Sequence, residues 1–186
     1  MRGPIAGLVI GFGLAIAAVS AAAAELNEVV ARGELIWAAD QEGGGPHVFP
    51  DPEDPQRLTG FEVELAEMIA GELGVKPRFQ QGQWDRLPLL LGRAADCVIN
   101  GIELTPQRQR DYRCSRPYFA YALQLIARRE SPLDSVERLS RAGPAGRWRV
   151  GVLSGSAAEM FFRTRSDLEA DAIGYEGTID SLEQLA

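Results

Sequence analysis

The chain has 186 residues with 19 Lys or Arg, 26 Asp or Glu, one His and two Cys, and its formal net charge is −7. This length suits one domain, or one domain and part of another, and 46% hydrophobic residues suffice for a packed core. The negative charge disfavours nucleic acid and anionic membrane surfaces as partners. A single His without a Cys-x-x-Cys pair excludes a zinc-thiolate or His-rich metal site, and we expect no cofactor.

The first residues have the pattern of an export signal. An apolar stretch over 5–19 ends in Ala22-Ala23-Ala24, which satisfies the small-x-small cleavage rule immediately before Glu25. Residues 1–24 are therefore predicted to be a cleaved signal peptide, and the mature protein is predicted to be periplasmic. An uncleaved anchor is the competing interpretation, because the whole stretch over 3–24 is nearly long enough to cross a bilayer.

The two cysteines must be considered in that oxidising setting. A bridge between Cys97 and Cys114 would close a short loop and add about 3 kcal/mol through chain entropy. Two buried thiols are the alternative, since Cys97 lies in an apolar run. The sequence leaves both states open.

Strand-like and helical segments alternate along the rest of the chain. In chain order we predict a strand at 35–39, a helix at 61–73, a strand at 78–80, a helix over 85–92, a strand at 97–100, a short helix from 105, strands at 122–127 and 149–153, a helix from 156, a strand at 171–175 and a helix from 179. Capping boxes are expected at Thr59 with Glu62 and at Ser156 with Glu159. This alternation predicts an α/β architecture with mostly parallel sheets.

Two of the predicted helix starts follow a strand and so point free backbone N–H groups beyond the edge of a sheet. At the first, Gly101 allows a close backbone approach, Thr105 caps the helix, and Arg108 offers a planar fork for a carboxylate. At the second, Ser154-Gly155-Ser156 offers hydroxyl and amide donors. Each pattern alone is weak, because Arg108 can equally pair with Asp111 on the surface.

The order of several short motifs resembles that of the periplasmic amino-acid-binding proteins of ABC importers. The likeness covers nearly all of residues 25–186. Its segments are 33–40, 60–66, 73–75, 84–87, 92–96, 100–101, 105–108, 115–118 and 150–156.

The resemblance implies a bilobed α/β fold of the type II periplasmic-binding class, which closes by hinge motion on a small ligand. Residues 25–120 would form lobe 1 and 121–186 part of lobe 2, with the first crossing between lobes at 118–123. Because the chain ends at Ala186, we expect an incomplete second lobe and low stability.

The resemblance also implies roles for particular residues. Arg108 would clamp the α-carboxylate of the ligand, Ser156 would add to that site, and the Asn100-Gly101 turn would take part of the α-amino group. Thr105 belongs to the same motif as Arg108. Asp40 matches an acidic position near the pocket, and Trp84 is either an apolar wall of the pocket or a core residue.

Two positions depart from the family pattern. Glu103 stands where Ser or Thr is common; pointing inward it would favour a ligand with a cationic or amide side chain, and pointing outward it is an ordinary loop acid. His47 lies where an aromatic residue often stacks on the ligand, and is either its substitute or a solvated loop residue.

Together these features predict a monomeric receptor that captures a polar amino acid or related zwitterion and delivers it to a permease in the inner membrane. One alternative is a periplasmic enzyme similar to cyclohexadienyl dehydratases, with Glu103 or His47 as the acid. Another is the ligand-sensing domain of a larger membrane protein.

Overall fold

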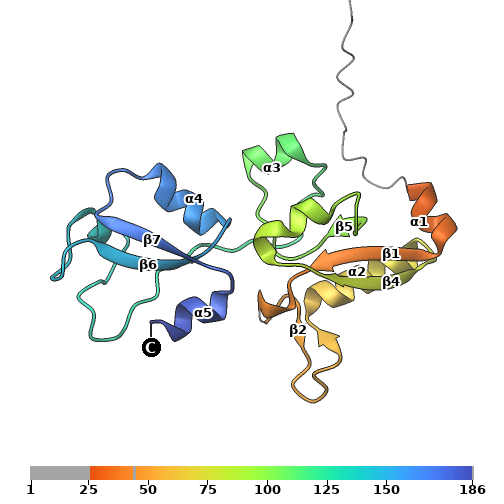
Figure 1. Ribbon diagram of the computed structural model, residues 1–186, viewed down its shortest axis with the longest axis horizontal. Coiled ribbons are helices and arrows are strands. Elements are labelled where there is room, and N and C mark those ends of the chain that lie inside the picture. The colour runs from red at the N-terminus through yellow and green to blue at the C-terminus, as the bar shows by residue number, and fades with distance from the viewer. Residues whose placement is uncertain (1–25, 44, 186) are drawn as a thin grey trace, which may run out of the picture.

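A three-stranded parallel sheet forms the centre of the N-terminal lobe, and a separate two-stranded parallel sheet forms that of the C-terminal lobe (Figure 1). The structure is a computed structural model, and it describes residues 26–43 and 45–185. The predicted signal peptide therefore lies outside the described residues. Within them, no helix is both long and apolar enough to cross a membrane.

In the N-terminal lobe, β1 (Glu34–Ala39) is the central strand, flanked by β4 (Lys76–Gln81) and β5 (Cys97–Val98). Trp37 on β1 lies opposite Phe79 on β4 and Cys97 on β5. The other elements of this lobe are α1 (Leu26–Arg32), η1 (Gln41–Gly43), the hairpin β2 (Phe49–Pro50) and β3 (Leu58–Thr59), α2 (Phe61–Glu72), η2 (Trp84–Leu90) and α3 (Pro106–Asp111). The strands and helices predicted from the sequence in this lobe are present, although the segment expected at 85–92 is a 3-10 helix that begins at Trp84.

The helix α2 buries a narrower face than its large apolar residues suggest. Glu62, Ala66 and Ala70 are fully buried at a spacing of four residues, whereas Met68 is 68% exposed. Since alanine side chains are short, this stripe lets the helix lie close to the sheet. The buried face is therefore marked by small residues and one acid, which a search for large apolar side chains does not detect.

The predicted capping box at Thr59 and Glu62 is wrong. The residue that caps α2 is Gly60, with φ at 121° and no side-chain cap, and a Cβ there would lie 2.0 Å from the backbone oxygen of His47. Only glycine accommodates that approach. The Glu62 side chain instead points into the lobe interior, where it has other partners.

In the C-terminal lobe, β6 (Trp148–Leu153) pairs in parallel with β7 (Ala170–Tyr175). Leu139, Leu168 and Ala170 form its buried core. The helices are η3 (Glu137–Ser140), α4 (Ala157–Thr164) and α5 (Thr178–Glu183). The strands predicted at 149–153 and 171–175, and the helices predicted from 156 and 179, are confirmed.

The joining segment, which runs from the end of α3 to the start of η3 and connects the two lobes, contains no helix or strand. The strand predicted at 122–127 is not formed, because the sheet of the C-terminal lobe contains only β6 and β7 among the described residues and the run pairs with neither. Leu125 packs against the core of this lobe, whereas Tyr121, Leu123 and Ile126 are 51–62% exposed. An apolar run of strand length thus remains unpaired.

A buried carboxylate connects the N-terminal lobe to this joining segment. Glu62 Oε1 accepts a hydrogen bond from the N–H of Gly101 at 2.7 Å and another from the hydroxyl of Tyr118. His47 Nδ1 lies 3.4 Å from Glu62 Oε2 without the alignment of a hydrogen bond. Burial by itself would raise the pKa of Glu62, but His47 and the hydrogen bonds from Tyr118 and Gly101 outweigh it, so the pKa of this carboxyl lies below its usual value.

Both cysteines are free thiols in the structure. Cys97 on β5 is partly buried, and burial together with the neighbouring Asp96 raises the pKa of its thiol to about 11. Cys114 is exposed and lies after α3. The structure therefore has no bridge between the two cysteines, and the alternative of two buried thiols is wrong for Cys114, which is exposed.

The lowered pKa of Glu62 predicts a pH-dependent contribution to stability. Because the pKa is lower in the folded than in the unfolded chain, the contribution is present above pH 4.5, the reference pKa, and is lost as pH falls through the folded pKa. Glu62→Gln should therefore reduce the free energy of unfolding at pH 6, and the gap to wild type should narrow by pH 3, measured by urea denaturation. Glu67→Gln, an exposed position on α2, is the control and should lower the free energy of unfolding at pH 6 less than Glu62→Gln does; a gap for Glu62→Gln that stays constant with pH would contradict the role of its carboxylate.

The two thiols should also react at different rates. A thiolate is the reactive form, so Cys97 in the native protein should be alkylated by iodoacetamide at pH 8 at least about tenfold more slowly than exposed Cys114. After unfolding without reductant both should be labelled, as read by mass spectrometry. Unlabelled cysteines joined by a bridge would overturn this assignment.

Candidate functional site

Asp40 follows β1 directly, and its buried carboxylate accepts only from donors of its own lobe. Oδ1 accepts from the backbone N–H of Glu42 and from Gln81 Nε2, each at 3.0 Å. Oδ2 accepts from the backbone N–H of Trp84, also at 3.0 Å. These bonds fix the loops that follow β1 and β4, so the structure gives Asp40 a supporting position.

Asn100 and Trp84 continue this network. Asn100 Oδ1 accepts from the N–H of Asp40 at 3.0 Å, and its carbonyl accepts from Trp84 Nε1 at 3.3 Å. The Trp84 ring packs with Ala38 and Leu87 in a core cluster. The Arg108 guanidinium also lies over this ring, 5.4 Å from its centroid, so Trp84 is both a core residue and a wall for the arginine.

Gly101 forms the turn between β5 and the loop that carries the predicted site. Its φ is 59°, in the left-handed region, and its N–H is bound by Glu62. A Cβ at this position would lie 3.1 Å from the His47 ring. His47 itself is partly buried against Phe61 and Phe119, with ring centroids 5.0 and 5.7 Å away. The interpretation of His47 as a solvated loop residue is therefore wrong.

The helix α3 starts as the sequence predicts. Thr105 Oγ1 caps it by accepting from the N–H of Arg108 at 3.2 Å, and Pro106 occupies the first turn. This fixes the direction in which the arginine leaves the helix. Arg108 does not pair with Asp111; its guanidinium reaches the junction between the lobes, where its side chain is only 17% exposed.

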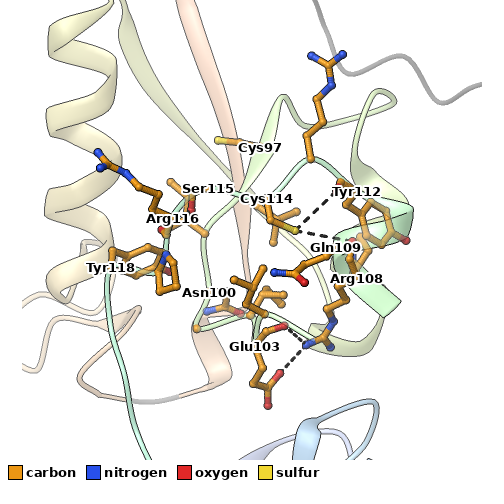
Figure 2. A pocket seen from close by; sticks show the side chains of 18 of the residues that line it. Cys97, Asn100, Glu103, Arg108, Gln109, Tyr112, Cys114, Ser115, Arg116 and Tyr118 are labelled. Carbon is orange, nitrogen blue, oxygen red and sulfur yellow. Dashed lines mark hydrogen bonds and ion pairs between the residues drawn. The ribbon is translucent and has the colours of Figure 1, made fainter. Parts of the chain in front are cut away.

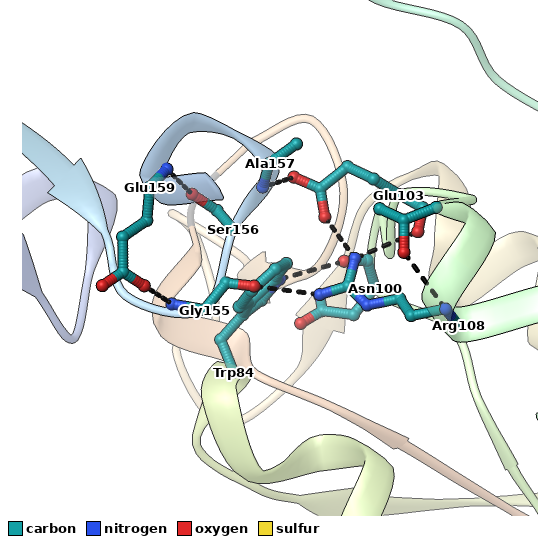
Figure 3. Close-up of polar contacts among 9 residues, drawn as sticks. Trp84, Asn100, Glu103, Arg108, Gly155, Ser156, Ala157 and Glu159 are labelled. Carbon is teal, nitrogen blue, oxygen red and sulfur yellow. Dashed lines mark hydrogen bonds and ion pairs between the residues drawn. The ribbon is translucent and has the colours of Figure 1, made fainter. Parts of the chain in front are cut away.

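At that junction the guanidinium has acceptors from both lobes (Figure 3). Nη1 donates to Glu103 Oε2 at 2.6 Å and to the Glu103 carbonyl at 3.0 Å. Nη2 donates to the carbonyl of Gly155, in the C-terminal lobe, at 3.0 Å. Arg108 therefore binds a carboxylate with one side of its fork and the second lobe with the other.

Glu103 points inward. Besides its pair with Arg108, its Oε1 accepts from the backbone N–H of Ala157, the first residue of α4, at 3.0 Å. A helix start carries N–H groups without acceptors inside the helix and favours negative charge. The Glu103 carboxylate is thus held between a guanidinium of one lobe and a helix N-terminus of the other.

Ser156 is buried and caps α4, because its Oγ accepts from the N–H of Glu159 at 3.3 Å. Glu159 in return accepts from the N–H of Gly155 at 2.7 Å. The second predicted capping box is confirmed, with the return bond on Gly155 rather than on the cap residue. Ser156 thereby orients the amide of Ala157.

Further contacts join the two lobes. Leu153 at the end of β6 packs against the core cluster around Trp84, and Gln83 Nε2 lies 3.3 Å from Glu176 Oε2. The two lobes therefore meet along a continuous contact around the Glu103 and Arg108 pair.

A groove of about 2250 Å³ runs along the N-terminal lobe beneath the joining segment (Figure 2). Of the predicted site residues, Asn100, Gly101, Glu103 and Arg108 line it; the other four (Asp40, Trp84, Thr105 and Ser156) do not. Small-molecule pockets usually measure about 300–1,000 Å³. This groove is larger, and the two charged residues of the predicted site that line it, Glu103 and Arg108, form an ion pair there.

Several residues at the site carried no recognisable signal in the sequence. Gly155 and Ala157 act through main-chain atoms, which residue type does not reveal. Partial burial and the negative charge of Glu103 raise the pKa of the Tyr121 hydroxyl to about 12, although the residue as a whole is half exposed. Among the described residues, no group of three or more His, Cys, Asp or Glu side chains is placed to hold a metal ion.

The geometry can be compared with known proteins. The L-cystine-binding protein TcyJ of Escherichia coli K12 is 35% identical over 141 residues, which is 74% of this chain and 50% of the relative. The ABC transporter arginine-binding protein 1 of the same strain is 28% identical over 64% of this chain and 46% of the relative. The chain thus spans about half the length of these curated relatives.

Among solved structures, the ancestral amino-acid-binding protein AncCDT-1, described as a precursor of cyclohexadienyl dehydratase, has a TM-score of 0.75 and 27% identity, covering 86% of this chain and 68% of that one. The expected periplasmic-binding fold is confirmed by this likeness. The sequence profile of the bacterial extracellular solute-binding proteins, family 3, matches residues 42–182. The chain belongs to family 3 of the bacterial extracellular solute-binding proteins.

Proposed function

We propose that the protein is a periplasmic receptor that binds an amino acid between its two lobes and delivers it to an ABC permease. The observation that carries this proposal is the carboxylate-binding arrangement at the lobe junction. There, the guanidinium of Arg108 and the N–H of Ala157 bind the carboxylate of Glu103 at 2.6 and 3.0 Å. The same donors suit the α-carboxylate of a free amino acid.

The other predicted residues take supporting roles in this proposal. Thr105 and Ser156 cap the helices that present Arg108 and Ala157, and Trp84 supports the guanidinium. Asp40 and Asn100 brace the loops below, and the turn at Gly101 sets the start of the loop that carries Glu103.

The inward carboxylate of Glu103 favours a ligand with a positive group besides its α-amino group. Relatives named for arginine binding agree with this preference. The relative named for L-cystine binding agrees as well, because L-cystine carries a second ammonium group. We propose a polar amino acid with a second positive group as the ligand class.

Export through cleavage of residues 1–24 and action as a monomer belong to the same proposal. Relatives described as periplasmic binding proteins support the location. A sensory role in a larger membrane protein would use the same site, and neighbouring genes for a kinase or cyclase instead of a permease would favour it.

An enzymatic role remains the alternative, supported by the likeness to a precursor of cyclohexadienyl dehydratase. Its test is direct. The purified protein is incubated with prephenate or arogenate, and an aromatic product detected by absorbance would favour the enzyme over the receptor.

Arg108→Ala should weaken binding of L-arginine or L-cystine, whichever the wild-type protein binds in a thermal-shift screen, at least roughly thirtyfold. Loss of one partner of a buried, hydrogen-bonded charge pair costs about 2–5 kcal/mol. Arg108→Lys keeps the charge but not the fork, and should fall between alanine and wild type. Isothermal calorimetry measures all three dissociation constants.

Arg110→Ala is the matched control, because Arg110 lies on the same short helix with an exposed side chain. It should bind as the wild type does. A dissociation constant for Arg108→Ala within a factor of three of wild type would refute the carboxylate role, and no thermal shift with any amino acid would refute the ligand class.

A further inference from the structure

We propose that Glu103 is an internal carboxylate that closes the two lobes on each other by occupying the donors a ligand carboxylate would take. In this view, ligand entry is an exchange of one carboxylate for another. The exchange rests on the proposed function, whereas the closing role of Glu103 does not.

Glu103 stands between the two lobes by its position in the chain. It lies on the loop between Gly101 and the cap residue Thr105, on the N-terminal lobe, yet one of its oxygens binds the C-terminal lobe at Ala157. Its other oxygen binds Arg108 of its own lobe. The carboxylate therefore bridges the lobes and is 15% exposed.

The donors on both sides of this bridge suit a carboxylate in charge and geometry. The guanidinium neutralises the carboxylate, and the Ala157 N–H belongs to a helix of eight residues whose N-terminus favours an anion. Arg108 adds a bond to the carbonyl of Gly155. Each group at the junction is thus bonded to a group of opposite charge or polarity, which is the condition for a partly buried ion pair to stabilise a contact.

The same bridge occupies donors that a ligand carboxylate would use. Nη1 of Arg108 bonds to Glu103 through both the side chain and the carbonyl, and the N–H of Ala157 also bonds to Glu103. An incoming carboxylate must displace the Glu103 side chain to bind Nη1 and the Ala157 amide together. Once displaced, Glu103 remains beside the site as a negative group for the cationic part of the ligand.

The amide of Ala157 reports on the bridge directly. As the first residue of α4 it has no acceptor within the helix, and its acceptor is Glu103 Oε1. Hydrogen exchange measured by NMR in buffer without amino acids should be at least about tenfold faster at this amide in Glu103→Ala. The amide of Met160, which bonds to the carbonyl of Ser156, should be unchanged and verifies that α4 is intact.

Glu159→Gln is the matched control variant. Glu159 also accepts from an amide at the start of α4, that of Gly155, but from within its own lobe. This variant should speed exchange at Gly155 and leave Ala157 protected. Glu103→Gln, which keeps the size of the side chain but not its charge, provides the same test with an intermediate effect if Glu103→Ala fails to fold.

Acetate tests the exchange. In Glu103→Ala, saturating acetate should restore protection of the Ala157 amide, whereas sodium chloride at equal ionic strength should not, and wild type should respond to neither. Unchanged exchange at Ala157 in both Glu103 variants would overturn the bridge. Failure of acetate to restore protection would overturn the shared carboxylate site. Because no amino acid is added, these results stand apart from the thermal-shift screen and the calorimetry on Arg108, which test the proposed function.

Discussion

The hydrogen bond between the N–H of Gly101 and the buried carboxylate of Glu62 determines how the chain leaves the first sheet. It fixes the turn after β5, from which the loop with Glu103 and the helix with Arg108 extend. The same carboxylate binds the hydroxyl of Tyr118, where the chain departs toward the second lobe. The candidate site and the connection between lobes therefore share one anchor. A buried charge is tolerated here because donors surround it.

A second carboxylate, that of Asp40 at the end of β1, also holds neighbouring loops in place through hydrogen bonds. It collects the N–H groups of the loops after β1 and β4 and so supports Trp84, on which the guanidinium of Arg108 rests. The site therefore has two parts. Asp40 and Glu62 are bonded within the N-terminal lobe, and the pair of Glu103 and Arg108 lies at the junction between the lobes. Of these four side chains, all within the described part of the chain, those of Glu103 and Arg108 have hydrogen bonds to the second lobe.

The sequence predicts the elements of this fold well, because strands and helices here follow their periodicity and capping residues. Thr105 and Ser156 cap their helices in the expected way. The failures have physical causes. Glu62 has the spacing of a cap but is an interior residue, since tertiary donors outcompete the backbone of its own helix. The apolar run at 122–127 has strand propensity without a strand to pair with.

For the site, the sequence identifies side chains but not their partners. It indicates Arg108 as a carboxylate ligand and leaves the direction of Glu103 undecided, because that direction depends on contacts across the lobes. The donors of the second lobe are main-chain groups, which no residue pattern specifies. Local sequence therefore predicts the helix caps and the candidate side chains of the site, but not the contacts that these side chains make with distant segments.

The use of main-chain atoms in the second lobe has a consequence for how such a protein changes over generations. Gly155 and Ala157 contribute a carbonyl and an amide to the bridge, and the amide persists for every replacement of Ala157 except proline, which has no N–H. Mutational drift in that lobe can therefore alter its surface without opening the junction. Selectivity would then be retuned mainly through the loop of the first lobe that carries Glu103.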